Sequence, residues 1–183
     1  MTDRDRLLTL LRERSLRRGD FLLASGARSS YYIDARLTTM SGEGQRLIGR
    51  LGLDALDRAG WSPAALGGLT LGADPVAYAV AHAAALAGRP LDAFTVRKEP
   101  KDHGTARLIE GNFLPGSEVV VVEDVVTTGG SALRAIEAVE REGGRVLGVF
   151  AVVERDHAGR VRLEEAGYAL MALCTAEELL GDS

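Results

Sequence analysis

The chain has very little cysteine and no long apolar run. Its 183 residues include one cysteine, Cys174, which excludes an internal disulfide and a zinc site built from several cysteines. No stretch approaches the roughly 18 apolar residues of a membrane-spanning helix. The N-terminal segment MTDRDRLLTLLRERSLRRGD is charged throughout and has no apolar core typical of a signal peptide. We therefore expect a cytoplasmic protein with no membrane partner.

Positive charge is also in short supply. The chain has 22 lysine and arginine residues against 26 aspartate and glutamate residues, which gives a net charge of −4. An acidic chain is a poor general binder of a phosphate backbone, so we expect no nucleic-acid partner. Hydrophobic residues make up 46% of the sequence, which is ordinary for a globular protein. The length fits one domain with its own core, and we expect a single domain over residues 1–183.

Helix-like and strand-like segments alternate along most of the chain. Helical spacing of apolar residues predicts helices over residues 3–17, 44–59, 74–87, 132–142, 158–166 and 176–180. Short apolar runs predict strands over residues 64–68, 91–96, 119–123, 146–153 and 168–172, and a hairpin from the runs 21–26 and 31–37. Strands that are apolar throughout and alternate with helices indicate a mostly parallel sheet covered on both faces. The expected fold class is therefore α/β.

The most informative stretch is VVVVEDVVTTGGS at residues 119–131. Its predicted strand ends in Glu123 and Asp124, which suit the hydroxyls of a sugar or a metal carried by a phosphate. The turn Thr127–Ser131 offers hydroxyls, backbone N–H groups and the start of a helix to a phosphate. It lacks the lysine of the GxxxxGK[ST] nucleotide loop, which favours a monophosphate over the β- and γ-phosphates of ATP. The simpler alternatives are a solvated acidic turn and an ordinary helix cap by Thr128 or Ser131.

A second polar segment gathers positive charge. Arg97, Lys98, Lys101, His103 and Arg107 place five basic or titratable groups within eleven residues. Pro100 and Gly104 interrupt any regular pattern, so we expect a mobile loop that closes over a polyanion. The alternative is a solvated surface loop.

Three polar or glycine-rich segments follow predicted strands: 67–72, 123–131 and 154–156. Because ligands of open parallel sheets bind beyond the carboxyl ends of the strands, we expect these segments to form one site.

Several of these segments resemble a known family. Glu123–Ser131 resembles the ribose-phosphate motif of the type I phosphoribosyltransferases. The segment RKEPKDHG at 97–104 is similar to the RKxxKxHG loop of the orotate phosphoribosyltransferases. The matching hood hairpin lies at about residues 18–40, where FLLASG and YIDAR occur, and the segments GGLTLGADP at 67–75 and RLIEG at 107–111 also fit. The resemblance extends over roughly residues 5–175.

The resemblance implies a fold, a reaction and partners. The fold would be a central, mostly parallel sheet flanked by helices, with a small N-terminal hood. The reaction would transfer ribose 5-phosphate from phosphoribosyl pyrophosphate (PRPP) to orotate, giving orotidine 5′-monophosphate and pyrophosphate in pyrimidine biosynthesis. It also implies Mg²⁺, held mainly through PRPP, and a homodimer in which the basic loop of one subunit closes over the active site of the other.

The same resemblance assigns roles to individual residues. It implies that PRPP is bound by Arg97, Lys98, Lys101, His103, Glu123, Asp124, Val125, Val126, Thr127, Thr128, Gly129, Gly130 and Ser131. It implies that orotate is bound by Thr127, Arg155, Ser25 and Gly26. It implies that Lys101, His103 and Asp124 are catalytic.

The sequence also departs from the family pattern. Ala24 and Leu71 stand where many members carry lysine, and Glu123 replaces the more usual aspartate. These differences leave more of the charge neutralisation to the basic loop and to Mg²⁺, and they leave Leu71 only its backbone for contact with pyrophosphate.

Three other functions stay open at this point. A type I transferase for a purine base would have no carboxylate for Arg155 to bind. A PRPP-binding regulator without catalysis would have little use for an intact basic loop. A simple nucleotide-sugar-binding module would not need Lys101 and His103.

Overall fold

The computed structural model describes residues 1–22, 26, 28–99 and 108–181. Ser25, Lys101 and His103, which belong to the expected site, lie outside the described residues.

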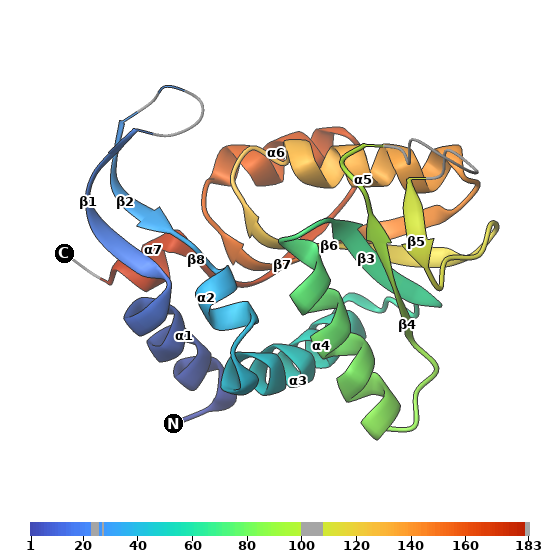
Figure 1. Cartoon of the computed structure of the whole chain (residues 1–183), viewed down its shortest axis with the longest axis horizontal. Helices are drawn as coiled ribbons and strands as arrows, with labels where there is room; N and C mark the ends of the chain where they lie inside the picture. The colour runs from blue at the N-terminus through green and yellow to red at the C-terminus, as the bar shows by residue number, and fades with distance from the viewer. Residues whose placement is uncertain (23–25, 27, 100–107, 182–183) are drawn as a thin grey trace.

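A six-stranded sheet forms the centre of the molecule (Figure 1). Its strand order is β5-β4-β3-β6-β7-β8, and its pairs are parallel except for the antiparallel pair of β4 and β5. The strands are β3 (Ala65–Leu69), β4 (Asp92–Val96), β5 (Ile109–Gly111), β6 (Glu118–Val126), β7 (Arg145–Glu154) and β8 (Leu170–Thr175). The expected mostly parallel α/β sheet is confirmed.

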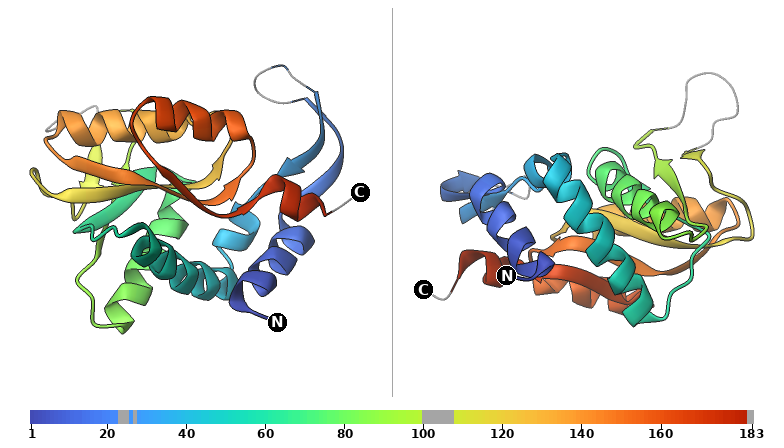
Figure 2. Two further views of the ribbon diagram at one scale, coloured as in Figure 1. Left: turned by 180° about the vertical axis from the view of Figure 1, so that it is seen from behind. Right: turned by 90° about the horizontal axis from the view of Figure 1, so that it is seen from below.

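Helices cover both faces of this sheet (Figure 2). They are α1 (Asp3–Arg14), α2 (Arg36–Thr39), α3 (Gly42–Ala59), α4 (Ala73–Leu86), α5 (Gly130–Arg141), α6 (His157–Glu165) and α7 (Ala176–Leu180). Valines of β6 show why both faces are covered: Val120 and Val122 pack with α3 and α4, whereas Val119 and Val121 pack with α5 and α6. A strand with valine on both sides is stable only when both sides are removed from water.

Glycine in β3 allows the tight packing at the centre of the sheet. A Cβ atom at Gly67 would lie 2.1 Å from the carbonyl oxygen of Phe94, and one at Gly68 would lie 2.2 Å from that of Val122. Any larger residue would therefore push β3 away from its neighbours. The carboxyl end of β3 is thus held close to that of β6, which carries the two candidate acids.

The hood is a separate two-stranded hairpin of β1 (Leu16–Leu22) and β2 (Arg28–Ile33), which extends away from the sheet (Figure 1). The expected hairpin is confirmed, but its first strand begins earlier than predicted. The pairing of Leu16 with Ile33 ends α1 at Arg14 and takes residues 16 and 17 out of the expected first helix.

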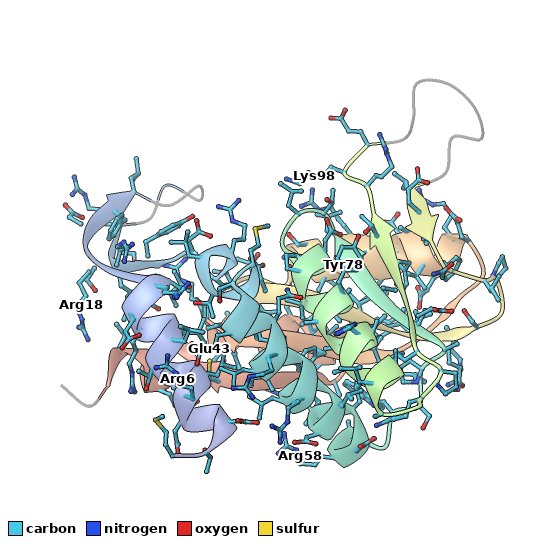
Figure 3. All side chains as sticks on the ribbon, turned by 60° about the horizontal axis from the view of Figure 1, so that its bottom comes forward. Arg6, Arg18, Glu43, Arg58, Tyr78 and Lys98 are labelled. Carbon is cyan, nitrogen blue, oxygen red and sulfur yellow. The ribbon has the colours of Figure 1, made fainter. Side chains whose placement is uncertain are left out.

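Arginines attach α1, the helix that precedes the hood, to the rest of the chain. Arg6 on α1 binds Glu43 on α3 through two hydrogen bonds of 2.7 and 2.9 Å, and the two side chains point toward one another in Figure 3. Arg12 donates to backbone carbonyls of Glu178 and Leu179 in α7. These contacts hold the first helix between the third and the last.

Two elements were not anticipated. The short strand β5 pairs with β4, and the short helix α2 occupies residues that the sequence placed at the end of a strand. The prediction of a strand over 31–37 is wrong beyond Ile33, where Asp34 accepts from the N–H and the guanidinium of Arg36 and turns the chain into the helix.

No helix in the described part of the chain combines the length and apolar composition that crossing a membrane requires.

Candidate active site

The expected site segments line one cavity of about 380 Å³ at the carboxyl ends of β3, β6 and β7. Its lining also includes the end of β2, the start of α2 and the N-terminal half of α5. The lining residues are Tyr32–Arg36, Leu69–Gly72, Lys98, Glu123–Val125, Thr127, Ser131, Arg134 and Arg155. A smaller cavity of about 100 Å³ adjoins the turn before α5 and is lined by Glu123, Val125–Gly130, Ser131 and Ala132. The convergence predicted from the strand ends is confirmed.

Glu123 and Asp124 lie within β6 and not at its end. The predicted strand end at Glu123 is wrong, because residues through Val126 continue to pair with β7. The two carboxylates consequently meet different surroundings. Glu123 also lines the small cavity before α5, whereas Asp124 faces Gly72 at the end of β3.

Gly72 is needed for this arrangement. A Cβ atom at position 72 would lie only 2.5 Å from Oδ1 of Asp124. Glycine therefore lets the turn after β3 approach the carboxylate directly, so that this turn and Asp124 can contact the same ligand.

The electrostatic environments of the two acids also differ. Burial, together with the nearby charge of Asp124, raises the pKa of Glu123 to about 8, while the charge of Arg134 opposes the shift. Its buried Oε1 atom has no hydrogen-bond partner among the described residues. Burial also raises the pKa of Asp124, while the hydrogen bond of 2.8 Å from the Val125 N–H to Oδ1 opposes the shift. A buried carboxylate oxygen without a partner is a position that a hydroxyl or a cation can fill.

The turn before α5 presents backbone donors to the small cavity. Gly129 adopts a left-handed conformation with φ of 73°, and α5 begins at Gly130, two residues before its predicted start. In the described structure no side chain caps this helix, so the alternative of an ordinary cap by Thr128 or Ser131 is wrong. The first N–H groups of a helix lack partners within it, and they bind phosphate oxygens well.

Arg155 connects the sheet to the hood. It directly follows β7, and its backbone N–H donates to the carbonyl of Val126 at 2.8 Å. Its guanidinium donates to the hydroxyl of Ser29 at 3.2 Å and lies 5.1 Å from the centre of the Tyr31 ring. Both partners belong to β2, so the hood fixes the direction of the arginine toward the cavity.

A buried ion pair supports the strand end that carries Arg155. Glu154 is 7% exposed and receives two hydrogen bonds, of 2.9 and 2.6 Å, from Arg160. Arg160 also donates to the carbonyl of Leu170 in β8 at 2.8 Å. The sequence analysis found Arg155 but not Ser29 or Tyr31, because partners so distant in sequence leave no local pattern. It also missed Arg160, which lies six residues from Glu154.

A hydrogen-bonded group holds the turn after β3. Asp74 accepts from the hydroxyls of Thr70 at 2.6 Å and Thr95 at 2.8 Å. The Tyr78 hydroxyl lies 3.2 Å from that of Thr95. The turn is therefore tied to α4 and β4 by side chains that the sequence analysis did not single out.

The structure places only part of the expected basic loop. Arg97 donates from its backbone to the carbonyl of Leu108 at 2.8 Å, and its guanidinium lies 3.9 Å from Glu110. Lys98 lies just beyond β4 and lines the main cavity (Figure 3). Gly26 is described but is not part of the cavity lining. Arg134, which the sequence analysis missed, contributes a further cation to the cavity.

The oxygen ligands present suit a magnesium ion. Mg²⁺ prefers carboxylate and phosphate oxygens and is commonly held by one or two carboxylates together with a substrate phosphate. The unpartnered Oε1 of Glu123 and the carboxylate of Asp124 supply such oxygens at the cavity. Within the described ranges, no three His, Cys, Asp or Glu side chains gather into a metal site of their own.

Comparison with known proteins gives a consistent result. Residues 42–168 match the model of the phosphoribosyl transferase domain. The orotate phosphoribosyltransferase of Aquifex aeolicus is 46% identical, over 98% of this chain and 99% of that protein. Mycobacterium tuberculosis H37Rv orotate phosphoribosyltransferase, solved in complex with PRPP, superposes with a TM-score of 0.84 at 42% identity, covering 98% of this chain and 100% of that one.

A further solved structure agrees. A phosphoribosyltransferase from Corynebacterium diphtheriae superposes with a TM-score of 0.87 at 38% identity, covering 99% of this chain and 100% of that one. The type I phosphoribosyltransferase fold expected from the sequence is therefore confirmed, and so is the family resemblance. Conserved length, fold and identity together show that this chain belongs to the orotate phosphoribosyltransferase family.

Proposed function

We propose that this chain transfers ribose 5-phosphate from PRPP to N1 of orotate, producing orotidine 5′-monophosphate and pyrophosphate in pyrimidine biosynthesis. One observation carries the proposal. Two adjoining cavities bring together a helix start suited to a phosphate, two acids suited to a sugar, and an arginine suited to a carboxylate. These are the chemical groups that PRPP and orotate present.

The proposed arrangement places each substrate group against a matching protein group. The 5-phosphate binds the N–H groups and hydroxyls of Thr127–Ser131, and the ribose hydroxyls bind Glu123 and Asp124. The orotate carboxylate binds Arg155, whose planar guanidinium can donate two parallel hydrogen bonds. Ser29 and Tyr31 hold that guanidinium in place.

The reaction exchanges one bond at C1 of the ribose for another. The C1–O bond to pyrophosphate breaks, and its electron pair leaves with the pyrophosphate. The lone pair of orotate N1 forms the new C1–N bond, and the N1 proton is lost to solvent. Positive charge develops on C1 and the ring oxygen in between, so the chain accelerates the reaction by binding that state more tightly than PRPP itself.

Neutralisation of the leaving group falls to the cations around the cavity. We propose that Arg97, Lys98, Lys101 and His103 bind the pyrophosphate, with Lys101 and His103 aiding its departure. Mg²⁺, held mainly through PRPP with Glu123 and Asp124 as the available protein oxygens, supplies further positive charge to the phosphates. Closure of the basic loop excludes water that would otherwise hydrolyse the sugar.

We also propose that residues 1–183 act as a single domain in a cytoplasmic homodimer with shared active sites. Exposed apolar side chains near the cavity support a subunit interface there. Four such side chains are each about half exposed or more: Leu37 on α2, Met40 directly after α2, Leu71 beside the cavity, and Tyr78 on α4. Apolar groups gathered on neighbouring elements are typical of a protein–protein interface.

A base-consumption assay tests the proposed activity. The protein is mixed with PRPP and Mg²⁺ and, in separate reactions, with orotate, uracil, adenine, guanine and hypoxanthine. We expect consumption of orotate alone, and we expect Arg155→Gln to raise the KM for orotate by at least about tenfold, since a charged hydrogen-bonded pair contributes about 1.5–3 kcal/mol. Consumption of a purine in place of orotate would overturn the proposal.

A further inference from the structure

A second cavity, of about 150 Å³, adjoins the main one at the edge of α5. Its lining includes the apolar side chains Leu69, Val96 and Leu108. Lys98 and Arg134 line both cavities, so the two spaces share a wall. The proposed reaction assigns Arg97 and Lys98 to the pyrophosphate of PRPP, but it gives no role to Arg134 and Arg141, which also line this space.

Positive charge dominates the second cavity. Arg97, Lys98, Arg134 and Arg141 line it, and Glu137 is the carboxylate among its lining residues. Glu137 already binds Arg141 at 2.6 Å, four residues further along α5. In the portion of the chain that is described, Lys98 and Arg134 form no ion pair with a carboxylate.

Two of the four cations have a carboxylate neighbour, Glu110 at 3.9 Å from Arg97 and Glu137 beside Arg141, so positive charge still exceeds negative charge around this space. Like charges around one space repel each other. This local excess of positive charge stands out because the net charge of the whole chain is −4. The apolar side chains Leu69, Val96 and Leu108 beside these cations lower the local dielectric constant, which strengthens the attraction for an anion. Guanidinium groups match the geometry of phosphate oxygens better than that of chloride.

We propose that this cavity is a second binding site for an oxyanion of the phosphate class. Arg97 and Arg141 would bind it directly, while Lys98 and Arg134 would be shared with the main cavity. The ligand we assign is inorganic pyrophosphate, which would pass over the shared wall after it leaves the ribose. That choice of ligand rests on the proposed function, whereas the anion site itself does not.

Calorimetric titration of the full chain with inorganic pyrophosphate at low ionic strength tests the site. Arg141→Gln should weaken the affinity by at least about threefold, because one cation is lost. Glu137→Gln should strengthen it by a similar factor, because the carboxylate that competes for Arg141 is removed. Both residues are exposed, and an ion pair four residues apart on a helix surface adds little stability, so both variants should fold.

Arg145→Gln is the matched control. Arg145 is also an exposed arginine paired with a glutamate, Glu118, but it lines neither the main cavity nor the second one. The proposal is overturned if Arg141→Gln and Glu137→Gln bind pyrophosphate as Arg145→Gln does, or if both shift the affinity in one direction. Opposite shifts for the two variants support it.

A parallel titration with inorganic phosphate separates the two parts of the proposal. If Arg141→Gln weakens and Glu137→Gln strengthens the binding of phosphate as well as of pyrophosphate, the site recognises a single phosphate group. If the two variants shift the anion affinity in opposite directions but the wild type consumes no orotate, the proposed function is overturned and the anion site is supported. If the wild type consumes orotate but neither variant changes the anion affinity, only the anion site is overturned.

Discussion

Neighbouring residues of the site have more different surroundings than their positions in the sequence suggest. Glu123 and Asp124 are adjacent, yet one is enclosed beside α5 and the other faces the glycine turn after β3. With a pKa of about 8, Glu123 holds a proton at neutral pH in the ligand-free protein. The site therefore avoids two unpaired buried negative charges until a ligand brings a cation or a hydroxyl.

This proton makes the stability of the protein depend on pH. A carboxyl whose pKa rises from 4.5 to about 8 on folding binds its proton more tightly in the folded state. The free energy of unfolding consequently falls as pH increases through that window, by about 1.4 kcal/mol per pH unit at most. Glu123→Gln cannot ionise, so urea unfolding between pH 5 and pH 9 should show a shallower decline for this variant than for the wild type.

Glu165→Gln provides the comparison, because Glu165 is exposed on α6. Its unfolding free energy should follow the wild-type pH dependence. Identical slopes for the wild type and Glu123→Gln would show that burial of Glu123 does not control the decline.

Residue type and position were sufficient to predict part of the site. The turn of small residues and Arg155 each follow a strand, and the two acids lie near the end of β6. Their chemistry is specific enough to suggest a sugar phosphate and a carboxylate. Arg134 was missed because it lies within a helix, where an arginine ordinarily faces water. Ser29 and Tyr31 were missed because their contact with Arg155 exists only after β2 of the hood comes to lie beside the end of β7.

At the scale of elements, Asp74 links three parts of the site. It lies in the first turn of α4, and it accepts from Thr70 in the turn after β3 and from Thr95 near the end of β4. That turn lines the main cavity on one side, and β4 leads into the basic segment on the other. Asp74 is therefore a positioning residue for both walls of the proposed pyrophosphate region.

Loss of this link should weaken the binding of PRPP. Asp74→Ala removes two hydrogen bonds to a carboxylate, and we expect the KM for PRPP to increase by about tenfold, which corresponds to about 1.4 kcal/mol. The KM for orotate should change little, because Arg155 lies across the cavity. Asp74→Asn retains one acceptor oxygen and should recover part of the loss in steady-state kinetics.

Asp92→Ala tests whether the effect is local. Asp92 is exposed and begins β4 at the end away from the cavity, so its removal should leave both KM values near those of the wild type. Equal increases in both KM values for Asp74→Ala would argue for general loosening of the fold instead.

The types of the elements were predictable, but their ends were less so. Valine-rich runs and helical spacing placed the main strands and helices near their observed positions. The end of β6 was set too early because two acids usually mark the edge of a sheet, whereas pairing with β7 carries the strand on to Val126. The start of α5 was set too late because a glycine pair usually delays a helix, whereas the left-handed Gly129 begins it here.

At the scale of the whole molecule, the distribution of positive charge matters more than its total. The chain contains two lysines, Lys98 and Lys101, and both belong to the basic segment. Its other positive side chains are arginines, several of which have structural partners. Arg4 and Arg12, for example, connect α1 to the C-terminal part of the chain. The lysines are thus concentrated where the proposal places the departing pyrophosphate.

The proposed dimer decides which subunit uses those lysines. If the basic loop closes over the partner's cavity, Lys101 and Asp124 of one active site come from different chains. Lys101→Ala and Asp124→Asn should each reduce turnover by at least about tenfold, or about 1.4 kcal/mol of barrier. A mixture of the two variants, unfolded and refolded together, should then recover roughly a quarter of wild-type activity, because half of the dimers are mixed and each has one intact site.

Recovery in the mixture depends on where the loop acts, which makes the measurement decisive. If each loop served its own subunit, every site in a mixed dimer would lack either the lysine or the aspartate, and the mixture would be as inactive as its parts. A mixture of Lys101→Ala with Lys101→Ala refolded in the same way controls for refolding alone.

Light scattering of the wild type should give the mass of two chains, since the exposed apolar side chains of α2 and α4 need a partner. A monomer with full activity would contradict the shared site, because a single chain would then supply both the lysine and the aspartate.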